Sequence, residues 1–240
     1  MNKAEELKKI IEKSNNICVF SGAGISCPSG IPDFRSADGL YNNDIGFGFS
    51  PEEIISHTFF KEHTDLFYQF YKSKMVYPGA RPNEAHRYFA GLEKQGKRVS
   101  VVTQNIDGLH NAASSSEVYE LHGSIFRNHC TKCGKFYPLE KIISSAEIPL
   151  CDDDNAVIKP DVVLYEEPLD DNVVNGAISA IASAKTVIVI GTSLAVYPAA
   201  SFLKFFRGDN LVLINKSSTP YDSNADLVIN DDIINVIKKL

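Results

Sequence analysis

Apolar residues occur along this chain in short unbroken runs, and small or polar residues follow each run directly. The clearest runs cover residues 17–20, 99–103, 186–190, 211–215 and 225–229. Runs of this kind, without polar alternation, are typical of parallel strands that are buried on both faces. The pattern therefore predicts several neighbouring strands of one parallel sheet.

Helical patterns lie between these runs, at residues 82–95, 169–183 and 198–206. Leu7, Ile10 and Ile11 predict one more short amphipathic helix near the N-terminus. Strands that alternate with helices favour an α/β fold with a doubly wound parallel sheet of the Rossmann-like type. Ligands bind beyond the carboxyl ends of the strands in such sheets, which is where the small and polar residues occur.

Two segments interrupt this alternation. Residues 37–80 are rich in Phe and Tyr, and residues 128–158 contain three of the five cysteines. We interpret both as insertions that form a smaller lobe, with a helical module at 37–80 and a cysteine-containing module at 128–158. The Rossmann-like domain would then consist of residues 1–36, 81–127 and 159–240.

Composition and charge narrow the possible functions. The chain is 44% apolar and 22% charged, as in an ordinary globular protein, and its net charge is −6. A nucleic-acid partner is not expected, because phosphate contacts need a basic face. No apolar stretch is long enough to span a membrane, and the charged N-terminus is unlike a secretory signal. Five cysteines, an odd number, favour free thiols or a metal site over disulfides, so we expect a cytoplasmic protein.

The sequence GAGIS follows the first predicted strand at residues 22–26. A glycine-rich turn after a strand lets backbone N–H groups approach a pyrophosphate, although the same glycines would also suit a tight turn. The usual three-glycine pattern is incomplete, because Cys27 takes the last glycine position, and Asp44 lies in a loop-like stretch. A second small-residue turn, Gly191-Thr192-Ser193, follows a later strand, and Asn215 ends the next one. We expect a dinucleotide to be held from both places.

A series of motifs then becomes specific. GAGIS and SGIPDFRS are followed by TQNIDGLH at 103–110, ELHGS at 120–124, a C-x2-C pair, KPDVVLYEE at 159–167, GTSLAVYPAA at 191–200 and LIN at 213–215. In this order the motifs resemble those of the sirtuins, NAD-consuming protein lysine deacylases, in a bacterial-type form. The resemblance covers roughly residues 15–232.

The resemblance implies roles for the residues of these motifs in binding NAD. The pyrophosphate would lie against the first glycine-rich turn, Gly22, Ala23, Gly24 and Ser26, and a closing loop with Asp33, Phe34 and Arg35 would cover the nicotinamide ribose. Amide and carboxylate groups of Gln104, Asn105 and Asp107 would orient the nicotinamide and its ribose. The adenosine would be held by later residues: Gly191, Thr192, Ser193, Asn215 and Asp231.

The resemblance also implies that His122 is the general base, with Asn105 and Asp107 as the other catalytic residues. An imidazole titrates near neutral pH and can accept a proton from a ribose hydroxyl. The acyl oxygen of a modified lysine would attack the anomeric carbon of NAD, nicotinamide would leave, and the acyl group would pass to ADP-ribose. His57, His63, His86, His110 and His129 keep the simpler interpretation of structural or surface residues.

The family's metal module has two cysteine pairs, and here it is incomplete. Cys130 and Cys133 form one pair and Cys151 takes the third place, but Asp154 stands where the fourth cysteine belongs. Since a carboxylate can bind zinc, we predict a zinc-ribbon-like module with these four ligands. His129 is an alternative fourth ligand, loss of the metal is a second alternative, and a redox pair of Cys130 and Cys133 is a third.

Substrate residues also follow from the resemblance. Val163 and Tyr165 would contact the acyl-lysine peptide, and Glu166 replaces a glycine of the family, which would either disturb backbone pairing or attract basic peptides. Tyr71 and Lys74 occur at the spacing of a Tyr–Arg pair that selects acidic acyl groups, but a core aromatic and a solvated lysine are the favoured interpretation. We expect an acetyl or longer apolar acyl group. The alternatives in function are a protein ADP-ribosyltransferase and a silent NAD-binding or ADP-ribose-binding module.

Overall fold

The computed structural model describes residues 2–34, 39–42 and 46–240. Six strands form a sheet in the order β3-β2-β1-β7-β8-β9, and every neighbouring pair is parallel. The chain runs outward from β1 in one direction and then returns to start the other half beside β1, which is the Rossmann order. The strands are β1 (Asn16–Ser21), β2 (Arg98–Thr103), β3 (Glu117–Glu120), β7 (Thr186–Ile190), β8 (Asn210–Ile214) and β9 (Leu227–Ile229).

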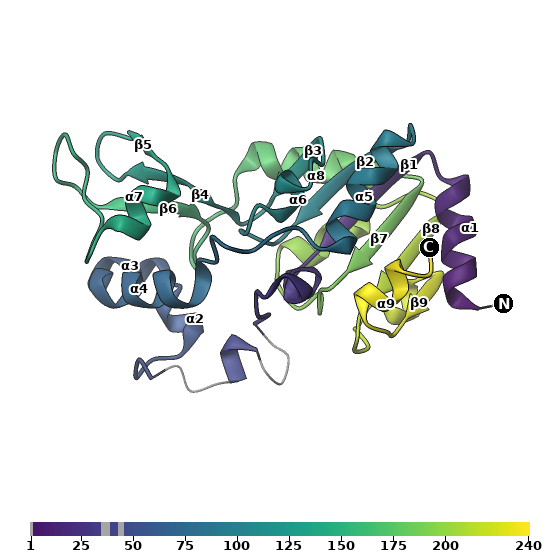
Figure 1. Ribbon diagram of the computed structural model, residues 1–240, viewed down its shortest axis with the longest axis horizontal. Coiled ribbons are helices and arrows are strands. Elements are labelled where there is room, and N and C mark those ends of the chain that lie inside the picture. Colours follow the sequence, from purple (N-terminus) through teal and green to yellow (C-terminus); the bar gives the residue numbers. More distant parts are fainter. Residues whose placement is uncertain (1, 35–38, 43–45) are drawn as a thin grey trace.

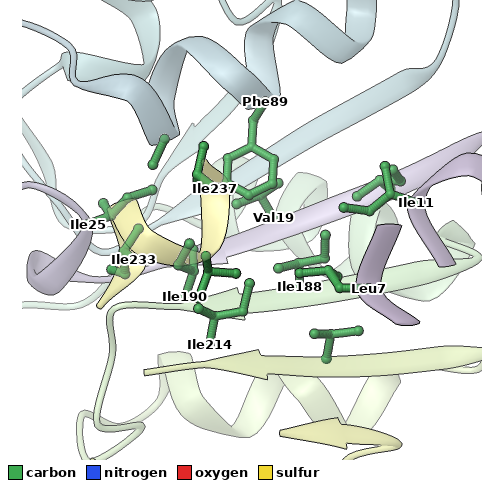
Figure 2. Close-up of a cluster of buried hydrophobic side chains, with 14 of the residues drawn as sticks. Leu7, Ile11, Val19, Ile25, Phe89, Ile188, Ile190, Ile214, Ile233 and Ile237 are labelled. Atoms are coloured by element: carbon green, nitrogen blue, oxygen red, sulfur yellow. The ribbon is translucent and has the colours of Figure 1, made fainter. Parts of the chain in front are cut away.

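Helices cover both faces of this sheet. One face packs on α1 (Lys3–Lys13), α5 (Glu84–Lys94) and α9 (Ile233–Ile237), and the other on α8 (Asp171–Ser183) and the 3₁₀ helix η5 (Ala199–Phe205). Alternate residues of β1 divide between the two cores: Ile17 and Val19 face the first, and Cys18 and Phe20 the second. Figure 2 shows side chains of the first core, among them Val19, Ile188 and Ile214 from the strands and Phe89 and Leu7 from the helices. Burial on both faces is why the runs lack polar alternation.

Side-chain caps begin several of these helices. The Asn2 side chain accepts from the Ala4 amide at α1, and the Asp170 carboxylate accepts from two amides of α8. The Asp232 carboxylate does the same at α9. These caps satisfy amides that have no partner within a helix.

A smaller lobe lies at the opposite end of the molecule from both termini (Figure 1). Its antiparallel sheet has the order β5-β4-β6 and packs on an aromatic core that includes Phe60, Phe67 and Tyr68. Its elements are α2 (Pro51–Ile54), α3 (His57–Glu62), α4 (Thr64–Phe70), the π-helix η4 (Tyr71–Met75), β4 (Gly123–Cys130), β5 (Phe136–Tyr137), α7 (Leu139–Ser144) and β6 (Ile158–Val162). Short helical turns complete the described chain: η1 (Ala23–Ile25), η2 (Cys27–Ser29), η3 (Leu40–Asn42), α6 (Leu109–Ala112) and η6 (Asp222–Asn224).

The predicted fold class is confirmed: a doubly wound parallel sheet carries a smaller lobe. All five predicted strands are present, and so are the helices, although residues 199–205 form a 3₁₀ helix. The edge strand β3 was not predicted, because its four residues are all half-buried and only Val118 and Tyr119 are apolar. The division into domains stays a prediction; β4 and β6 cross its boundaries at 127/128 and 158/159 and belong to the small sheet.

Candidate active site

The two small-residue turns meet at the point where the strand order reverses. Gly24 donates its amide proton to the Gly191 carbonyl at 2.8 Å, and the Gly22 amide donates to Ile190 at 3.1 Å. A Cβ atom on Gly191, whose φ is +63°, would lie 2.4 Å from the amide nitrogen of Ile25. These glycines are therefore needed where two backbones touch, and the amides of Gly22 and Gly24 are already used inside the protein. Ala23 lies between them, in η1.

Three candidate residues form one polar cluster beside this junction. Ser26 Oγ donates to Asp107 Oδ2 at 2.6 Å and accepts from Asn105 Nδ2 at 3.1 Å. Asp107 Oδ1 also accepts from the Leu109 amide at 2.9 Å. Burial raises the pKa of Asp107, and the hydrogen bonds from Ser26, Leu109 and Asn105 oppose that rise. The cluster offers an oriented amide and a carboxylate to polar groups of a ligand.

His122 lies between β3 and β4, and its ring has a defined orientation. Nδ1 is 2.9 Å from the carbonyl oxygen of Gln104, the residue before Asn105. Because a carbonyl only accepts hydrogen bonds, Nδ1 carries the proton of the neutral ring and Nε2 is left as a base. Burial lowers the pKa of His122, and the bond to Gln104 partly offsets this. The ring is thus a neutral proton acceptor at physiological pH.

The small sheet fixes the backbone at this histidine. The Val163 amide donates to the His122 carbonyl at 3.0 Å, and a Cβ atom on Gly123 would lie 1.7 Å from the Asp161 carbonyl. Only glycine allows β4 and β6 to approach so closely at this position. His122 is therefore tied to the β6 side of the small lobe as well as to the Gln104 backbone.

The remaining predicted nucleotide residues lie around the same end of the sheet. Gln104 Nε2 donates to Thr192 Oγ1 at 3.1 Å, which joins the ends of β2 and β7, and Ser193 beside it is exposed. Asn215 follows β8 and donates to the Ser217 carbonyl at 3.0 Å. The Asp231 carboxylate accepts from the Asp232 amide, Asn235 and Lys239, so its charge is already compensated within α9 and its flanks.

The predicted closing loop is described in part. Asp33 lies near Cys27, with Oδ2 at 3.7 Å from its sulfur, and Phe34 packs on Tyr41 with ring centroids 5.3 Å apart. The Tyr41 hydroxyl lies 3.2 Å from that of Tyr165. This loop therefore reaches the predicted substrate segment. Arg35 and Asp44 lie outside the described residues.

The predicted substrate segment follows β6 and is held by α3. Tyr165 is 40% exposed, and its backbone bonds with Ile55 and His57. Glu166 has a φ of +75°, a conformation that favours glycine, and its carboxylate accepts from the Thr58 amide at 2.9 Å and hydroxyl at 2.7 Å. These two hydrogen bonds at the start of α3 compensate for the unfavourable backbone conformation.

Tyr71 and Lys74, the pair considered for acidic acyl groups, lie in the small lobe. Tyr71 is fully buried, stacks on Phe67 with ring centroids 5.6 Å apart, and belongs to the aromatic core of the small lobe. Both residues lie in the π-helix, and Lys74 is half-buried. The burial of Tyr71 favours the interpretation as a core aromatic.

The four predicted metal ligands come together. One ligand atom from each of Cys130, Cys133, Cys151 and Asp154 lies within 4.8 Å of the other three. Cys133 and Cys151 sulfurs are 3.7 Å apart, and Cys130 Sγ is 3.4 Å from Asp154 Oδ1. Tetrahedral zinc, with bonds of about 2.3 Å to sulfur and 2.1 Å to oxygen, requires edges of about 3.8 Å and 3.6 Å. The donor set therefore fits zinc.

Neighbouring groups support this donor set. The amides of Lys132 and Cys133 point at Cys130 Sγ, both at 3.4 Å, and the Tyr137 hydroxyl donates to Cys151 Sγ at 3.2 Å. Such donors stabilise thiolates. His129 is not among the ligand atoms grouped in the described chain, and its ring packs on Phe136. The structure thus favours Asp154 over His129 as the fourth ligand.

Comparison with known proteins identifies the family. The sequence model described as the Sir2 family matches residues 22–198. A protein of Clostridium perfringens named NAD-dependent protein deacetylase is 55% identical over 240 residues, which cover 100% of this chain and 98% of that one. A protein of the same name from Clostridium acetobutylicum is 54% identical over 99% and 98% of the two chains. The chain belongs to the Sir2 family.

Solved structures agree in fold. A Sir2 structure with deacetylated p53 peptide and 3′-O-acetyl ADP ribose has a TM-score of 0.89 and 37% identity, over 98% of this chain and 96% of that one. A structure titled Sir2-p53 peptide-NAD+ has a TM-score of 0.85 and 38% identity, over 98% and 95%. Another contains a propionylated peptide, with a TM-score of 0.86 and 37% identity over 100% and 97%.

Several residues around the site were not predicted from the sequence. Ser21 and Thr103 bond to each other at 2.9 Å beneath Asn105, and Tyr137 supports the metal ligands. Ser21 directly follows one predicted strand and Thr103 ends another, so a hydroxyl at the end of each strand was the available indication in the sequence. Tyr137 gave no signal, since nothing in its sequence neighbourhood distinguishes it from a core aromatic.

Proposed function

We propose that this chain is an NAD-dependent protein lysine deacylase that transfers the acyl group to ADP-ribose and releases nicotinamide. The observation that carries the proposal is the orientation of His122, whose Nδ1–H is bound to the Gln104 carbonyl at 2.9 Å. This bond leaves Nε2 as the proton acceptor of the neutral ring, and it ties the ring to the residue directly before Asn105 of the Ser26–Asn105–Asp107 cluster. The deacetylase names of its relatives and the NAD-containing Sir2 structure support the proposal.

The residues divide the work between orientation and proton transfer. Asn105 and Asp107 are held by Ser26, so that their polar groups can position the nicotinamide ribose with little further ordering. His122 Nε2 then accepts the proton of a ribose hydroxyl as that oxygen attacks the acyl-derived carbon. NAD, as the second substrate, supplies the sugar carbon from which nicotinamide leaves.

The acyl group that we propose is acetyl first, with longer apolar acyl groups next. A Sir2 structure at 36% identity contains an acetylated peptide, and one at 37% contains a propionylated peptide. A pair formed by Tyr71 and Lys74 for acidic acyl groups has no support, because Tyr71 is buried. Exposed Tyr165 and half-buried Val163 are the proposed substrate contacts.

Zinc would have a structural role in this protein, since four protein ligands leave no position for a substrate. All five cysteines are free, and no helix of the described chain is long and apolar enough to cross a membrane. Together with the bacterial relatives, the free thiols support our proposal that the protein acts in the cytoplasm.

The test is to incubate the zinc-loaded chain with NAD and an acetyl-lysine peptide, and to follow nicotinamide and acetylated ADP-ribose by mass spectrometry. We expect both products in equal amounts, only with acetylated peptide, and their loss in His122→Ala. His63→Ala is the matched control, because His63 packs on Phe59 in the small lobe. Label transferred to protein would indicate an ADP-ribosyltransferase, and NAD binding without products a silent module.

A further inference from the structure

Two buried histidines lie next to each other behind the candidate site. His86 of α5 and His110 of α6 are 0% and 2% exposed, and their ring centroids are 4.7 Å apart at an interplanar angle of 64°. His86 Nε2 and His110 Nδ1 are buried without a hydrogen-bond partner among the described residues. Such atoms are rare in folded proteins, because burial removes a polar group from water without giving it a new hydrogen bond.

His110 is connected to the backbone of Asn105. Its Nε2 lies 2.9 Å from Ser21 Oγ, which donates to Thr103 Oγ1 at 2.9 Å. Thr103 Oγ1 also accepts the amide proton of Asn105 at 3.1 Å. A chain of three hydrogen bonds therefore runs from the His110 ring to a residue of the polar cluster.

His86 is connected to the loop that carries Ser26. Its Nδ1 accepts from the Asn83 amide at 3.4 Å, at the start of α5. The Asn83 side chain donates to the Ile25 carbonyl at 2.7 Å and to Ser29 Oγ at 2.9 Å. The histidine pair thus lies between the two segments that meet in the Ser26–Asn105–Asp107 cluster.

These bonds define where each ring carries its proton. Ser21 uses its single hydroxyl proton on Thr103, so His110 Nε2 must donate to Ser21, and Nδ1 is bare. His86 Nδ1 accepts from Asn83, so its proton is on Nε2. The two atoms without partners are therefore one donor, on His86, and one acceptor, on His110. They are chemically complementary.

We propose that His86 and His110 form a neutral pair, both protonated on Nε2, in which His86 donates to Nδ1 of His110 directly or through one water. As positioning residues, the pair would hold the Asn105 backbone and the loop of residues 22–30 in the arrangement that binds NAD. This inference rests on the proposed function for its effect on catalysis, but the protonation pattern does not depend on that function.

Two nearly isosteric substitutions separate positioning from simple core packing. In His110→Gln, the side-chain amide takes the place of Nε2 and can still donate to Ser21. In His110→Asn, the shorter amide reaches only the place of Nδ1 and leaves Ser21 without its donor. Both variants bury a neutral amide, so a purely structural role predicts similar losses of stability in the two.

The kinetic arm compares these variants with the zinc-loaded wild-type chain, using NAD and an acetyl-lysine peptide. We expect His110→Gln to keep kcat and the KM for NAD within about 3-fold, and His110→Asn to lose about 10–100-fold in kcat/KM for NAD. Unfolding midpoints are measured for both. Equal kinetic losses in the two variants would overturn the positioning role.

The spectroscopic arm uses long-range ¹H–¹⁵N spectra of the histidine rings, assigned with His86→Asn and His110→Gln. We expect both rings to be protonated on Nε2, with no titration where ordinary imidazoles titrate. Ser115, whose buried hydroxyl also lacks a partner, provides a control, and Ser115→Ala should leave the His110 signals unchanged. A proton on Nδ1 of either ring, or a shift of His110 in Ser115→Ala, would overturn the pair. An inactive wild type with the expected spectra would reject the proposed function and keep the pair.

Discussion

The two sheets of this protein are stabilised in different ways. The six-stranded sheet is buried on both faces by mainly aliphatic side chains from five helices. The three-stranded sheet has one aromatic core on the inside and, at the ends of β4 and β6, a cluster of three sulfurs and one carboxylate. Apolar burial on both faces stabilises the first sheet, whereas the second sheet gains a further constraint from the sulfur and carboxylate cluster when it holds zinc.

This difference matters because His122 lies where the two regions meet. The Rossmann-like sheet provides the glycine junction and the Ser26–Asn105–Asp107 cluster, while β4 and β6 fix the His122 backbone through Val163 and Gly123. We therefore expect damage to the small sheet to reduce the rate of catalysis more strongly than it reduces the affinity for NAD. Damage to the glycine junction should impair NAD binding while zinc stays in place.

Removing zinc should have the largest effect. After chelation, we expect hydrogen exchange to rise in β4, β5 and β6, and deacylation to fall by at least about 100-fold because His122 is misplaced. The dissociation constant for NAD, measured by calorimetry, should change by less than about 3-fold. Added zinc should restore activity and magnesium should not. Equal losses of NAD binding and activity would contradict the division between the two regions.

Gly191→Ala should damage the other region. A Cβ atom at a φ of +63° and 2.4 Å from the Ile25 amide nitrogen cannot be accommodated without moving the backbone. We expect the free energy of unfolding to fall by about 4 kcal/mol, with weaker NAD binding and unchanged zinc content. Gly91→Ala is the control, because Gly91 lies within α5 and a methyl group there would meet no atom of another element within 4 Å. This control should be neutral or stabilising.

Acid should destabilise the large domain through its buried histidines. Burial lowers the pKa of His86 to about 4, compared with 6.5 for an ordinary imidazole. The unfolded chain then binds the extra proton first, so the free energy of unfolding falls as pH drops from 6.5 towards 4. The full loss is about 3 kcal/mol, and burial of His110 acts in the same direction. Denaturant unfolding at several pH values should show that the free energy of unfolding depends less on pH in His86→Asn than in wild type.

Asp154→Cys should have the smallest effect. A fourth thiolate is a better zinc ligand than a carboxylate that also accepts the Ala156 amide at 3.0 Å. We expect zinc to bind about 10-fold more tightly in competition with a chromogenic chelator, a gain of about 1.4 kcal/mol. Asp153→Cys is the matched control, since Asp153 pairs with Lys135. Unchanged affinity in Asp154→Cys would indicate that Asp154 is not a ligand.

Sequence patterns predicted five of the six strands of the large sheet, because each of these five contains a short apolar run that can be recognised without information from distant residues. They could not predict β3, whose half-buried residues alternate weakly, or the π-helix that carries Tyr71 into a core. The family motifs indicated His122 and Asn105 as candidate site residues, but the direction of the His122 ring follows from a single bond to a backbone carbonyl. The histidine pair was also hidden, because His86 and His110 are brought together only by the packing of α5 on α6.

A crystal structure with a non-hydrolysable NAD analogue and an acetyl-lysine peptide would examine the geometry on which the proposed chemistry depends. We predict that His122 Nε2 and the Asn105 side chain lie within hydrogen-bonding distance of the same nicotinamide ribose, with the pyrophosphate beside the Gly22–Gly24 turn. Side chains of His122 and Asn105 that point into separate cavities, with the ribose bound elsewhere, would contradict it.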